Sequence, residues 1–302
     1  MPEEPTEEEK RERRDWRRRL NREFREVASA SVHRGVKLVV HRPDFERAHI
    51  EEYARLSRDL IPVVREIARK TLPLLEQEPI PEFSRNQVYG SKFQADGVVY
   101  RDYRTFAKKR SPSDSPSLIV GLRIDESASM SAFGRLDAAK RAVIAVVEFC
   151  RRCKIPVSVY GDTADASRLE QMSVFAYLDD RKPDVGDRYR LMNIRARSNN
   201  RDGLALRLLA DRLAKSTRTT KLLISLSDGQ PKAMPDYTGE FAQEDMRRTL
   251  AEFERKGVSF LAAAIGQDKD VICRIYGIGR FLDITDLNEL PAQLVGIVAR
   301  YL

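Results

Sequence analysis

Oxygen-bearing side chains are concentrated in three short polar segments of the sequence, DESAS, NNRDG and SDGQP. The residues in these segments that could hold a cation are Asp125, Ser127, Ser129, Asp202 and Asp228. Carboxylate and hydroxyl oxygens without a nearby His or Cys suit Mg²⁺, with Mn²⁺ or Ca²⁺ as competitors, and do not suit zinc. The first hypothesis is therefore a metal site built from oxygen ligands alone.

The elements that must position these residues are visible in the pattern of apolar runs after Ser117. Short apolar runs alternate there with longer amphipathic stretches, which is typical of a parallel sheet covered by helices. The predicted strands are 118–124, 155–160, 172–178, 220–227, 258–265 and 281–284, and the predicted helices are 134–153, 203–215, 242–256 and 286–301. We therefore expect an α/β fold class: a doubly wound, mostly parallel, Rossmann-like sheet flanked by helices, with an N-terminal helical region.

The polar segments lie where such a sheet binds its ligands. Open sheets of this kind bind ligands at the carboxyl ends of the strands, beside the point where the strand order reverses. The segment with Asp125, Ser127 and Ser129 directly follows the first predicted strand, and Asp228 directly follows the fourth. Because the carboxylate and the two hydroxyls alternate along a tight loop, we expect them to converge. Asp202 directly precedes a predicted helix, so it could serve as a ligand or as a helix N-cap.

Composition divides the chain into three regions. Residues 1–75 keep helical spacing of their apolar side chains from Glu7 to about Leu75, and a second helix is predicted to begin at Asp44. Residues 76–117 are rich in Pro, Gly, Ser and Asp, which indicates a connector with at most short strands. Residues 118–302 form the predicted α/β domain.

The positive charge of the chain is concentrated near its N-terminus. The net charge is +8, and Lys10 to Arg25 contains nine Lys or Arg against three acidic residues. A basic run of this kind raises the possibility of a nucleic-acid partner. Aromatic residues interleaved with the charges, which single-strand binding surfaces use for stacking, are missing. Nucleic-acid binding is therefore disfavoured.

The sequence also indicates the cellular compartment of the protein. No apolar run approaches the roughly 20 residues that cross a bilayer, and the first residues lack the apolar core of a secretory signal. The three cysteines, Cys150, Cys153 and Cys273, are too few and too clustered to form the disulfide framework of a secreted domain. We expect no membrane span and a cytoplasmic location.

The polar segments resemble the von Willebrand factor A (vWA) fold and its metal-ion-dependent adhesion site (MIDAS), over roughly Leu118 to Leu302. The hallmark of that site is Asp-x-Ser-x-Ser after the first strand, with Thr and Asp from later loops. The resemblance implies that Ser127 and Ser129 bind the metal through their hydroxyls. It implies that Asp125 and Asp228 act directly or through ordered water.

The third segment departs from this pattern and carries a closer resemblance. Asp202 stands where many family members have Thr, and Asn200 is the alternative ligand from the same loop. The Asn-x-Asp-Gly segment and the Ser-Asp-Gly-x-Pro loop look like those of the A domains of the CobT subunit of cobalt chelatase and of the NorD-type activation proteins for nitric oxide reductase. Both groups work beside MoxR-like or chelatase-type AAA+ ATPases.

This closer resemblance implies a non-catalytic role. The chain would be an adaptor or co-chaperone for such an ATPase in metalloenzyme activation or metal insertion, with the ATPase and a client metalloprotein as partners. The adhesion site would receive a carboxylate from a partner as the last ligand of the metal. The sequence has no phosphate-binding Gly-x-x-x-x-Gly-Lys-Ser/Thr segment, so ATP hydrolysis must come from a partner chain.

Two other functions are weighed against this one. The same carboxylates could form a Mg²⁺-dependent phosphohydrolase site in which an aspartate attacks phosphorus. The haloacid-dehalogenase type of such enzymes would need a second Asp two residues after Asp125, where Ser127 stands, so this function is disfavoured. The chain could also be a nucleic-acid scaffold that uses its basic N-terminal helix, in which case deletion of residues 1–30 should abolish a strongly salt-dependent affinity.

Several residues that bind metals in other proteins have a structural interpretation here. Cys150 and Cys153 form one pair within a predicted helix and lack the second pair that would complete a zinc site, so they are predicted to be core residues. His33, His41 and His49 are spaced by eight residues, which does not align them on one face of a helix.

Overall fold

A seven-stranded sheet forms the centre of the molecule. The structure is a computed structural model, and it describes residues 6–76, 83–87, 92–93, 106–109, 117–229, 231–265, 269–284 and 286–301. The strand order in the sheet is β1-β7-β6-β5-β8-β9-β10. The strands are β1 (Leu38–His41), β5 (Leu118–Asp125), β6 (Val157–Ser167), β7 (Glu170–Leu178), β8 (Thr220–Ser227), β9 (Val258–Ala264) and β10 (Phe281–Asp283). The predicted α/β fold with a mostly parallel sheet is confirmed.

Strand β5 lies in the middle of the sheet and pairs in parallel with β6 on one side and with β8 on the other. Strands β6 and β7 are antiparallel, which the alternation of apolar runs did not reveal. The reason is the length of the connection: β6 ends at Ser167 and β7 begins at Glu170. A two-residue turn can join only antiparallel neighbours, because a parallel pair needs a crossover of a dozen or more residues.

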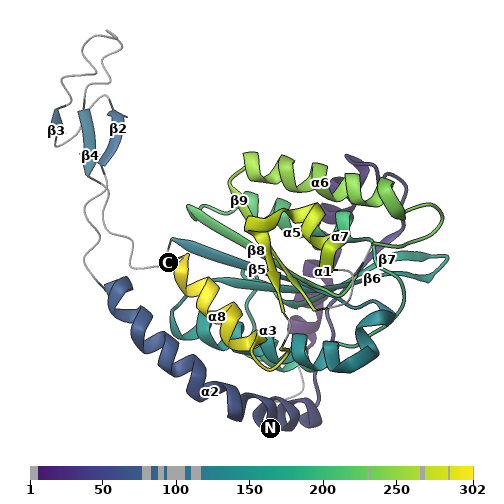
Figure 1. Ribbon diagram of the computed structural model, residues 1–302, viewed down its shortest axis with the longest axis horizontal. Helices are drawn as coiled ribbons and strands as arrows, with labels where there is room; N and C mark the ends of the chain where they lie inside the picture. Colours follow the sequence, from purple (N-terminus) through teal and green to yellow (C-terminus); the bar gives the residue numbers. More distant parts are fainter. Residues whose placement is uncertain are drawn as a thin grey trace.

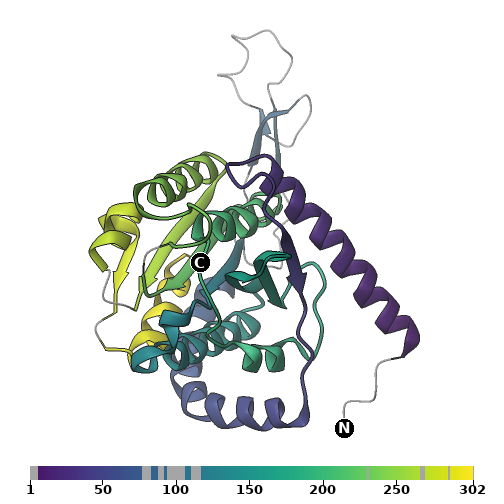
Figure 2. The same ribbon diagram turned by 90° about the vertical axis from the view of Figure 1, so that its right-hand side faces the viewer.

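Helices cover both faces of the sheet (Figures 1 and 2). One face carries α2, α3 and α8, and the other carries α1, α5, α6 and α7. The helices are α1 (Glu7–Ser29), α2 (Arg47–Glu76), α3 (Arg135–Arg152), α4 (Asp187–Arg190), α5 (Asp202–Ala214), α6 (Gly239–Arg255), α7 (Lys269–Tyr276) and α8 (Leu290–Arg300). Short 3₁₀ segments are η2 (Ala128–Gly134), η3 (Leu191–Asn193) and η4 (Ile278–Arg280). The four helices predicted after residue 117 correspond to α3, α5, α6 and α8.

The N-terminal helical region is confirmed, and it contributes to the same core as the sheet. Trp16, Leu20 and Phe24 recur on one face of α1 and are buried against the sheet. Between α1 and α2 the chain forms β1, which pairs in parallel with the edge of β7. Strand β1 was not predicted. Residues 6–76 therefore complete the sheet and cover both of its faces, rather than forming an appendage beside it.

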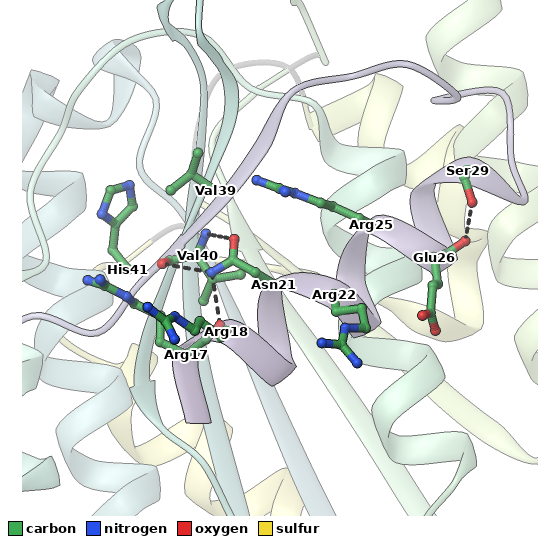
Figure 3. A pocket seen from close by; sticks show the side chains of 10 residues that line it. All are labelled: Arg17, Arg18, Asn21, Arg22, Arg25, Glu26, Ser29, Val39, Val40 and His41. Atoms are coloured by element: carbon green, nitrogen blue, oxygen red, sulfur yellow. Dashed lines mark hydrogen bonds between the residues drawn. The ribbon is translucent and has the colours of Figure 1, made fainter. Parts of the chain in front are cut away.

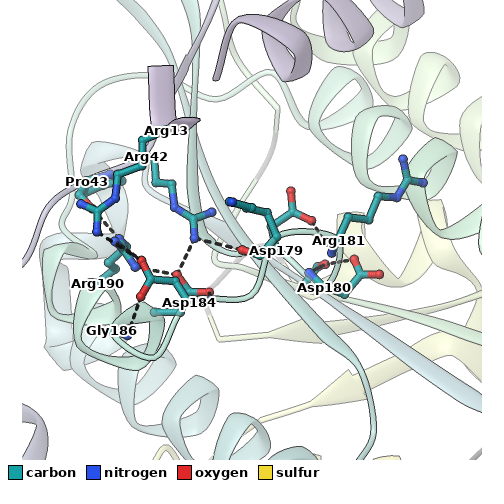
Figure 4. A network of polar contacts seen from close by, with 12 residues as sticks. Arg13, Arg42, Pro43, Asp179, Asp180, Arg181, Asp184, Gly186 and Arg190 are labelled. Carbon is teal, nitrogen blue, oxygen red and sulfur yellow. Dashed lines mark hydrogen bonds and ion pairs between the residues drawn. The ribbon is translucent and has the colours of Figure 1, made fainter. Parts of the chain in front are cut away.

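Two arginines, Arg42 and Arg190, join the segment between β1 and α2 to the segment after β7 (Figure 4). Arg42 Nη2 lies 2.7 Å from Asp187 Oδ1, and Arg190 Nη2 lies 2.8 Å from Asp184 Oδ2. Arg190 also donates from Nε to the Pro43 carbonyl at 2.9 Å. The Arg190 side chain is fully buried, and a buried guanidinium is tolerated only when its donors are paired, as these are.

Most of the predicted connector, residues 76–117, lies outside the described residues. Its described parts form a separate three-stranded sheet of β2 (Phe83–Gln87), β4 (Phe106–Lys109) and β3 (Lys92–Phe93), in that order. Within the described parts of the chain, no helix combines the length and apolar character that a membrane span requires.

Candidate metal centre

The candidate site lies at the carboxyl ends of the two central strands. Asp125 is the last residue of β5, and Ser227 is the last residue of β8. The two strands are neighbours in parallel register, with Ile124 opposite Leu226. The chain leaves β5 towards β6 on one side of the sheet, while β8 lies on the other side, so the strand order reverses here. This is the position at which doubly wound sheets bind ligands.

Three oxygen-bearing side chains from two loops lie together at this edge of the sheet. The hydroxyl oxygens of Ser127 and Ser129 lie 3.0 Å apart, and Ser129 donates to Asp228 Oδ1 at 2.8 Å. Ser127 and Asp228 are buried, whereas Ser129 is exposed at the start of η2. The cluster is therefore closed on its inner side and accessible from solvent at Ser129.

Asp125 is fully buried and accepts three hydrogen bonds. Its Oδ1 accepts from the Ser127 backbone N–H at 2.8 Å, and its Oδ2 accepts from Ser227 Oγ at 2.8 Å and from Asn200 Nδ2 at 3.1 Å. A carboxylate with this many donors is fixed in orientation. Asp125 thus ties together the three loops that follow β5, precede α5 and follow β8.

The third loop supplies Asn200 and Asp202, and both are engaged by other groups. Asp202 Oδ1 accepts a hydrogen bond from the buried Arg123, and its Oδ2 accepts from Asn200 Nδ2 at 3.3 Å. The oxygen of Asn200 accepts from the Lys232 backbone N–H at 2.8 Å. Asp202 is the first residue of α5, with Arg201 at the N-cap and no side-chain cap bond. The N-cap interpretation of Asp202 is therefore wrong, and its main partner is Arg123.

Arg123 forms a buried ion-pair network beneath the site. Its guanidinium bonds Asp162 through Nε at 2.5 Å and Nη2 at 2.7 Å, in addition to Asp202. Burial raises the pKa of Asp202 to about 7, and the nearby carboxylates of Asp125 and Asp162 act in the same direction, while Arg123 opposes them. Burial likewise raises the pKa of Asp162. Two carboxyl groups therefore share one buried guanidinium, and burial makes the charged form of each harder to keep.

A second arginine, Arg135 at the start of α3, faces the cluster from the other side. Its Nη1 lies 2.7 Å from Asp228 Oδ2, so the two oxygens of this carboxylate are divided between Ser129 and Arg135. Burial raises the pKa of Asp228, although the hydrogen bonds from Ser129 and Arg135 oppose the shift. Neither Arg123 nor Arg135 was identified from the sequence. Arg123 had a usable signal, because it is the one cationic residue in the apolar strand LIVGLRID.

Glu126 follows Asp125 but belongs to a different buried cluster. Its Oε1 accepts from Tyr177 OH at 2.6 Å, and its Oε2 accepts from Arg197 Nε at 2.8 Å. Burial raises the pKa of Glu126 to about 7, with Arg197 and Tyr177 partly offsetting the shift. A Cβ atom at Gly161 would lie 1.8 Å from Glu126 Oε1, so only glycine leaves room for this carboxyl group.

The donor set fits a hard divalent cation. Ser127, Ser129 and Asp228 present oxygens to one another from two loops, and Asp125 lies directly behind them. Oxygen ligands of this kind are those of Mg²⁺, Mn²⁺ and Ca²⁺. Throughout the described segments, no three His, Cys, Asp or Glu side chains are grouped so that they could hold a metal ion by themselves. Any ion at this position would therefore depend on the two hydroxyls.

The Cys and His residues lie apart from this cluster. Cys150 and Cys153 are buried in the core beside α3, as predicted. His33 Nε2 lies 2.9 Å from Asp245 Oδ2, while His41 is bonded to Glu170. His49 Nδ1 accepts from the Glu46 backbone N–H at 2.9 Å. Each described histidine thus has its own partner in a different part of the molecule.

The chain is similar to known proteins both in sequence and in fold. Residues 157–302 match the family described as "Cobalamin biosynthesis protein CobT VWA domain". The matched segment contains Asp202 and Asp228 and begins after the loop that carries Asp125, Ser127 and Ser129. The pilus adhesin SpaC from Lactobacillus rhamnosus GG, in its open conformation, shares the fold over 64% of this chain and 31% of that chain, with a TM-score of 0.50 and 13% identity.

Two curated relatives match a larger part of the chain. The chain is 24% identical over 268 residues to "Uncharacterized protein YojO" of Bacillus subtilis, which covers 84% of this chain and 39% of that protein. It is 27% identical over 234 residues to "Protein NorD" of Brucella melitensis, which covers 72% of this chain and 36% of that protein. The chain spans less than two fifths of the length of these relatives.

The central sheet and these matches identify a von Willebrand factor A domain in the chain. Within that class, residues 157–302 are similar to the CobT VWA domain, and a longer part of the chain is similar to NorD and YojO.

Proposed function

We propose that this chain is a metal-dependent protein-interaction module, and that it acts as an adaptor for a MoxR-like or chelatase-type AAA+ ATPase during metalloenzyme activation or metal insertion in the cytoplasm. The observation that carries the proposal is the convergence of Ser127, Ser129 and Asp228 at the carboxyl ends of β5 and β8. The similarity to CobT and NorD-like vWA domains supports the class of partner.

In this proposal the side chains at the candidate site hold a cation, and one side of that cation stays open to a partner. Ser127 and Ser129 would bind the ion through their hydroxyls, and Asp228 through Oδ1 in place of its hydrogen bond from Ser129. Asp125 would act through ordered water, since it is fully buried behind these residues. A bound Mg²⁺ would supply a positive centre that attracts a carboxylate from the partner. The exposed position of Ser129 marks the side from which that carboxylate would approach.

The burial of Asp125 argues against the alternative phosphohydrolase. A nucleophilic aspartate must present a free oxygen to phosphorus. Here Oδ1 accepts from the Ser127 N–H, and Oδ2 accepts from Ser227 and Asn200. The Asp125 side chain therefore serves to organise the loops in this arrangement and not to attack a substrate.

Calorimetric titration of Mg²⁺ and Mn²⁺ into EDTA-treated, dialysed protein tests the metal site. We expect saturable binding that is lost in the double variant Ser127→Ala/Asp228→Ala. The matched control is Ser131→Ala, because Ser131 lies in the same loop but donates only to the Ala128 carbonyl, at 2.7 Å. Equal binding by the double variant and the control would overturn the assignment of the site.

Capture of a purified MoxR-type ATPase, with and without EDTA, tests the adaptor role. We expect capture that requires both the metal and Asp228. Metal binding without any effect on capture would make the site structural and remove the mechanism of the proposed adaptor.

A further inference from the structure

A groove with a volume of about 750 Å³ runs between α1 and β1, away from the candidate metal centre (Figure 3). Its basic lining residues are Arg17, Arg18, Arg22, Arg25 and His41, and its acidic lining residue is Glu26. The volume lies in the range of pockets that bind ligands. The groove is thus large enough for a ligand and strongly positive.

The charge of the groove continues along the exposed face of α1. Five arginines spaced by three or four residues share one side of this helix, namely Arg11, Arg14, Arg18, Arg22 and Arg25. Residues at this spacing are neighbours on the helix surface. At 1.5 Å per residue the stripe is about 21 Å long. All five side chains are exposed, so the stripe is available to a partner.

Two acidic residues of α1 pair with cations outside the helix and not with this stripe. Glu12 Oε2 lies 2.7 Å from Lys182 Nζ, and Glu23 Oε2 lies 3.1 Å from Arg212 Nη1. Lys182 and Arg212 both lie outside α1. Arg18 has one contact at 3.9 Å with Asp15. Among the residues that the structure describes, Arg17 and Arg22 have no ion-pair partner. The four arginines that line the groove outnumber Glu26, so the groove carries a surplus of positive charge.

Recognition in the groove must use side chains, because the adjoining sheet edge is closed. Asn21 Oδ1 accepts from the Val40 N–H at 2.9 Å, and Asn21 Nδ2 donates to the Val40 carbonyl at 3.5 Å. Arg25 donates to the Leu38 carbonyl through Nε and Nη2, both at 3.1 Å. These contacts occupy both backbone groups of Val40 and the carbonyl of Leu38, so an incoming strand would have to displace them to add to the sheet.

We propose that the α1–β1 groove is a docking site for an acidic polypeptide segment of a partner protein. Guanidinium groups bind carboxylates through paired, charge-assisted hydrogen bonds, and Arg is the only cationic residue on the stripe. The half-buried Val39 adds an apolar contact on the floor of the groove. The stripe would bind successive carboxylates along an extended segment. This inference is independent of the proposed metal-dependent function.

The packing of α1 favours a polypeptide over a nucleic acid. A recognition helix must enter the major groove of a duplex, whereas α1 lies flat on the sheet with Trp16, Leu20 and Phe24 buried. Stacking platforms for single strands need exposed aromatic rings. Trp16 and Phe24, the aromatic residues of α1, are both turned into the core.

Fluorescence anisotropy with a labelled oligoglutamate peptide tests the docking site. We expect salt-sensitive binding that Arg18→Glu/Arg22→Glu weakens by about tenfold or more. The matched control is Arg65→Glu/Arg69→Glu, an exposed pair at the same spacing on α2 that changes the net charge equally. Addition of EDTA should leave the affinity unchanged, which separates this site from the metal centre.

Further measurements distinguish a specific docking site from non-specific charge attraction and from nucleic-acid binding. The milder variant Arg18→Gln/Arg22→Gln should weaken binding less than the charge reversal and, with circular dichroism, shows whether folding is preserved. An oligoglutamine peptide of equal length should not bind. Equal loss in the α2 control would show non-specific attraction and overturn the proposal. Binding of duplex DNA or RNA without binding of oligoglutamate would overturn it in favour of a nucleic-acid partner.

Discussion

Arg135 Nη1 lies 2.7 Å from Asp228 Oδ2, so a guanidinium bonds the carboxylate that is proposed to bind a cation. The same guanidinium stacks against Phe133, 5.1 Å from the centre of its ring. Arg135 therefore connects the inside of the candidate site with the exposed η2 segment. Two opposite roles can be separated by experiment: competition with the metal for Asp228, or orientation of Asp228 for the metal.

We expect Arg135→Gln to tighten Mg²⁺ binding. Removal of one positive charge a few ångströms from the ion should favour the bound state by about 1 kcal/mol, or about fivefold in affinity. Calorimetric titration of both proteins measures this change. Arg141→Gln, on the same helix and outside the cluster, controls for the change in net charge. Weaker binding by Arg135→Gln would instead assign the residue to orientation of Asp228.

The left-handed backbone at Phe133 should cost stability. Phe133 has a φ of 56° and is 78% exposed, so its side chain gains little from burial. We expect Phe133→Asn to raise the free energy of unfolding by about 0.5–1 kcal/mol, because Asn tolerates this conformation better. Urea denaturation measures the difference. The same substitution at the exposed Phe241, which lies within α6, should give no gain. An unchanged stability of Phe133→Asn would mean that φ imposes no strain there.

The buried network around Arg123 should be sensitive to removal of its cation. We expect Arg123→Met to lower the free energy of unfolding by about 3–5 kcal/mol, because Asp162 and Asp202 would be left buried without a counter-charge. Urea denaturation at neutral pH provides the measurement. Lys256→Gln breaks an exposed pair with Glu252 and should cost less than about 1 kcal/mol. Comparable costs for the two variants would contradict the network as a determinant of stability.

Gly161 should tolerate no side chain. A Cβ atom there would lie 1.8 Å from Glu126 Oε1 and 2.9 Å from Tyr177 Cε2. We expect Gly161→Ala to lower the free energy of unfolding by about 2 kcal/mol or more, since neither buried neighbour has room to move. Gly296→Ala is the control, because nothing lies within 4 Å of its Cβ position in α8 and alanine favours a helix. A neutral Gly161→Ala variant would show that Glu126 can be repositioned.

The contact between α2 and α3 should weaken in acid. Glu148 accepts from Tyr53 OH at 2.7 Å and pairs with Arg152 at 2.7 Å. Burial raises the pKa of Glu148, but the hydrogen bonds from Tyr53, Arg151 and Arg152 outweigh it, so the pKa is lowered overall. The folded state thus favours the ionised carboxylate. Its contribution is present above the unfolded value near 4.5 and is lost as the pH falls through the lower folded value.

Urea denaturation between neutral pH and about pH 3 checks this contribution. Glu148→Gln should be less stable than the unchanged protein at neutral pH, and the difference should shrink as the pH falls below the unfolded value. Glu240→Gln, an exposed position at the start of α6, should show no such convergence. A difference that stays constant with pH would assign the effect of Glu148→Gln to packing rather than to charge.

The sequence was most informative where burial is strongest. Strand β5 and helix α3 are nearly continuous in their buried apolar side chains, so their positions could be predicted closely. Strand β1 has four residues and alternates between buried and half-buried positions, which is too weak a pattern to detect. Helix α7 has eight residues and was missed for the same reason of length.

The loops of the candidate site could be predicted, but the pairing within them could not. The alternating spacing of Asp125, Ser127 and Ser129 predicts that they converge, because alternate residues of a tight loop face the same side. The partner of Asp202 is the guanidinium of Arg123, which comes from a strand more than seventy positions earlier in the chain. Such long-range pairing has no local signature.

The contacts of Asn21 and Arg25 with β1 have a consequence for how the protein behaves when α1 is detached. Strand β1 is the outermost strand of the sheet, and its free side is covered by these two side chains. Without α1 the strand would present unpaired backbone groups beside the uncovered apolar surface beneath Trp16 and Phe24. Exposed edges of this kind template aggregation. Helix α1 therefore shields this edge of the sheet from pairing with other chains. Truncation of the chain through α1 should have self-association as its first effect.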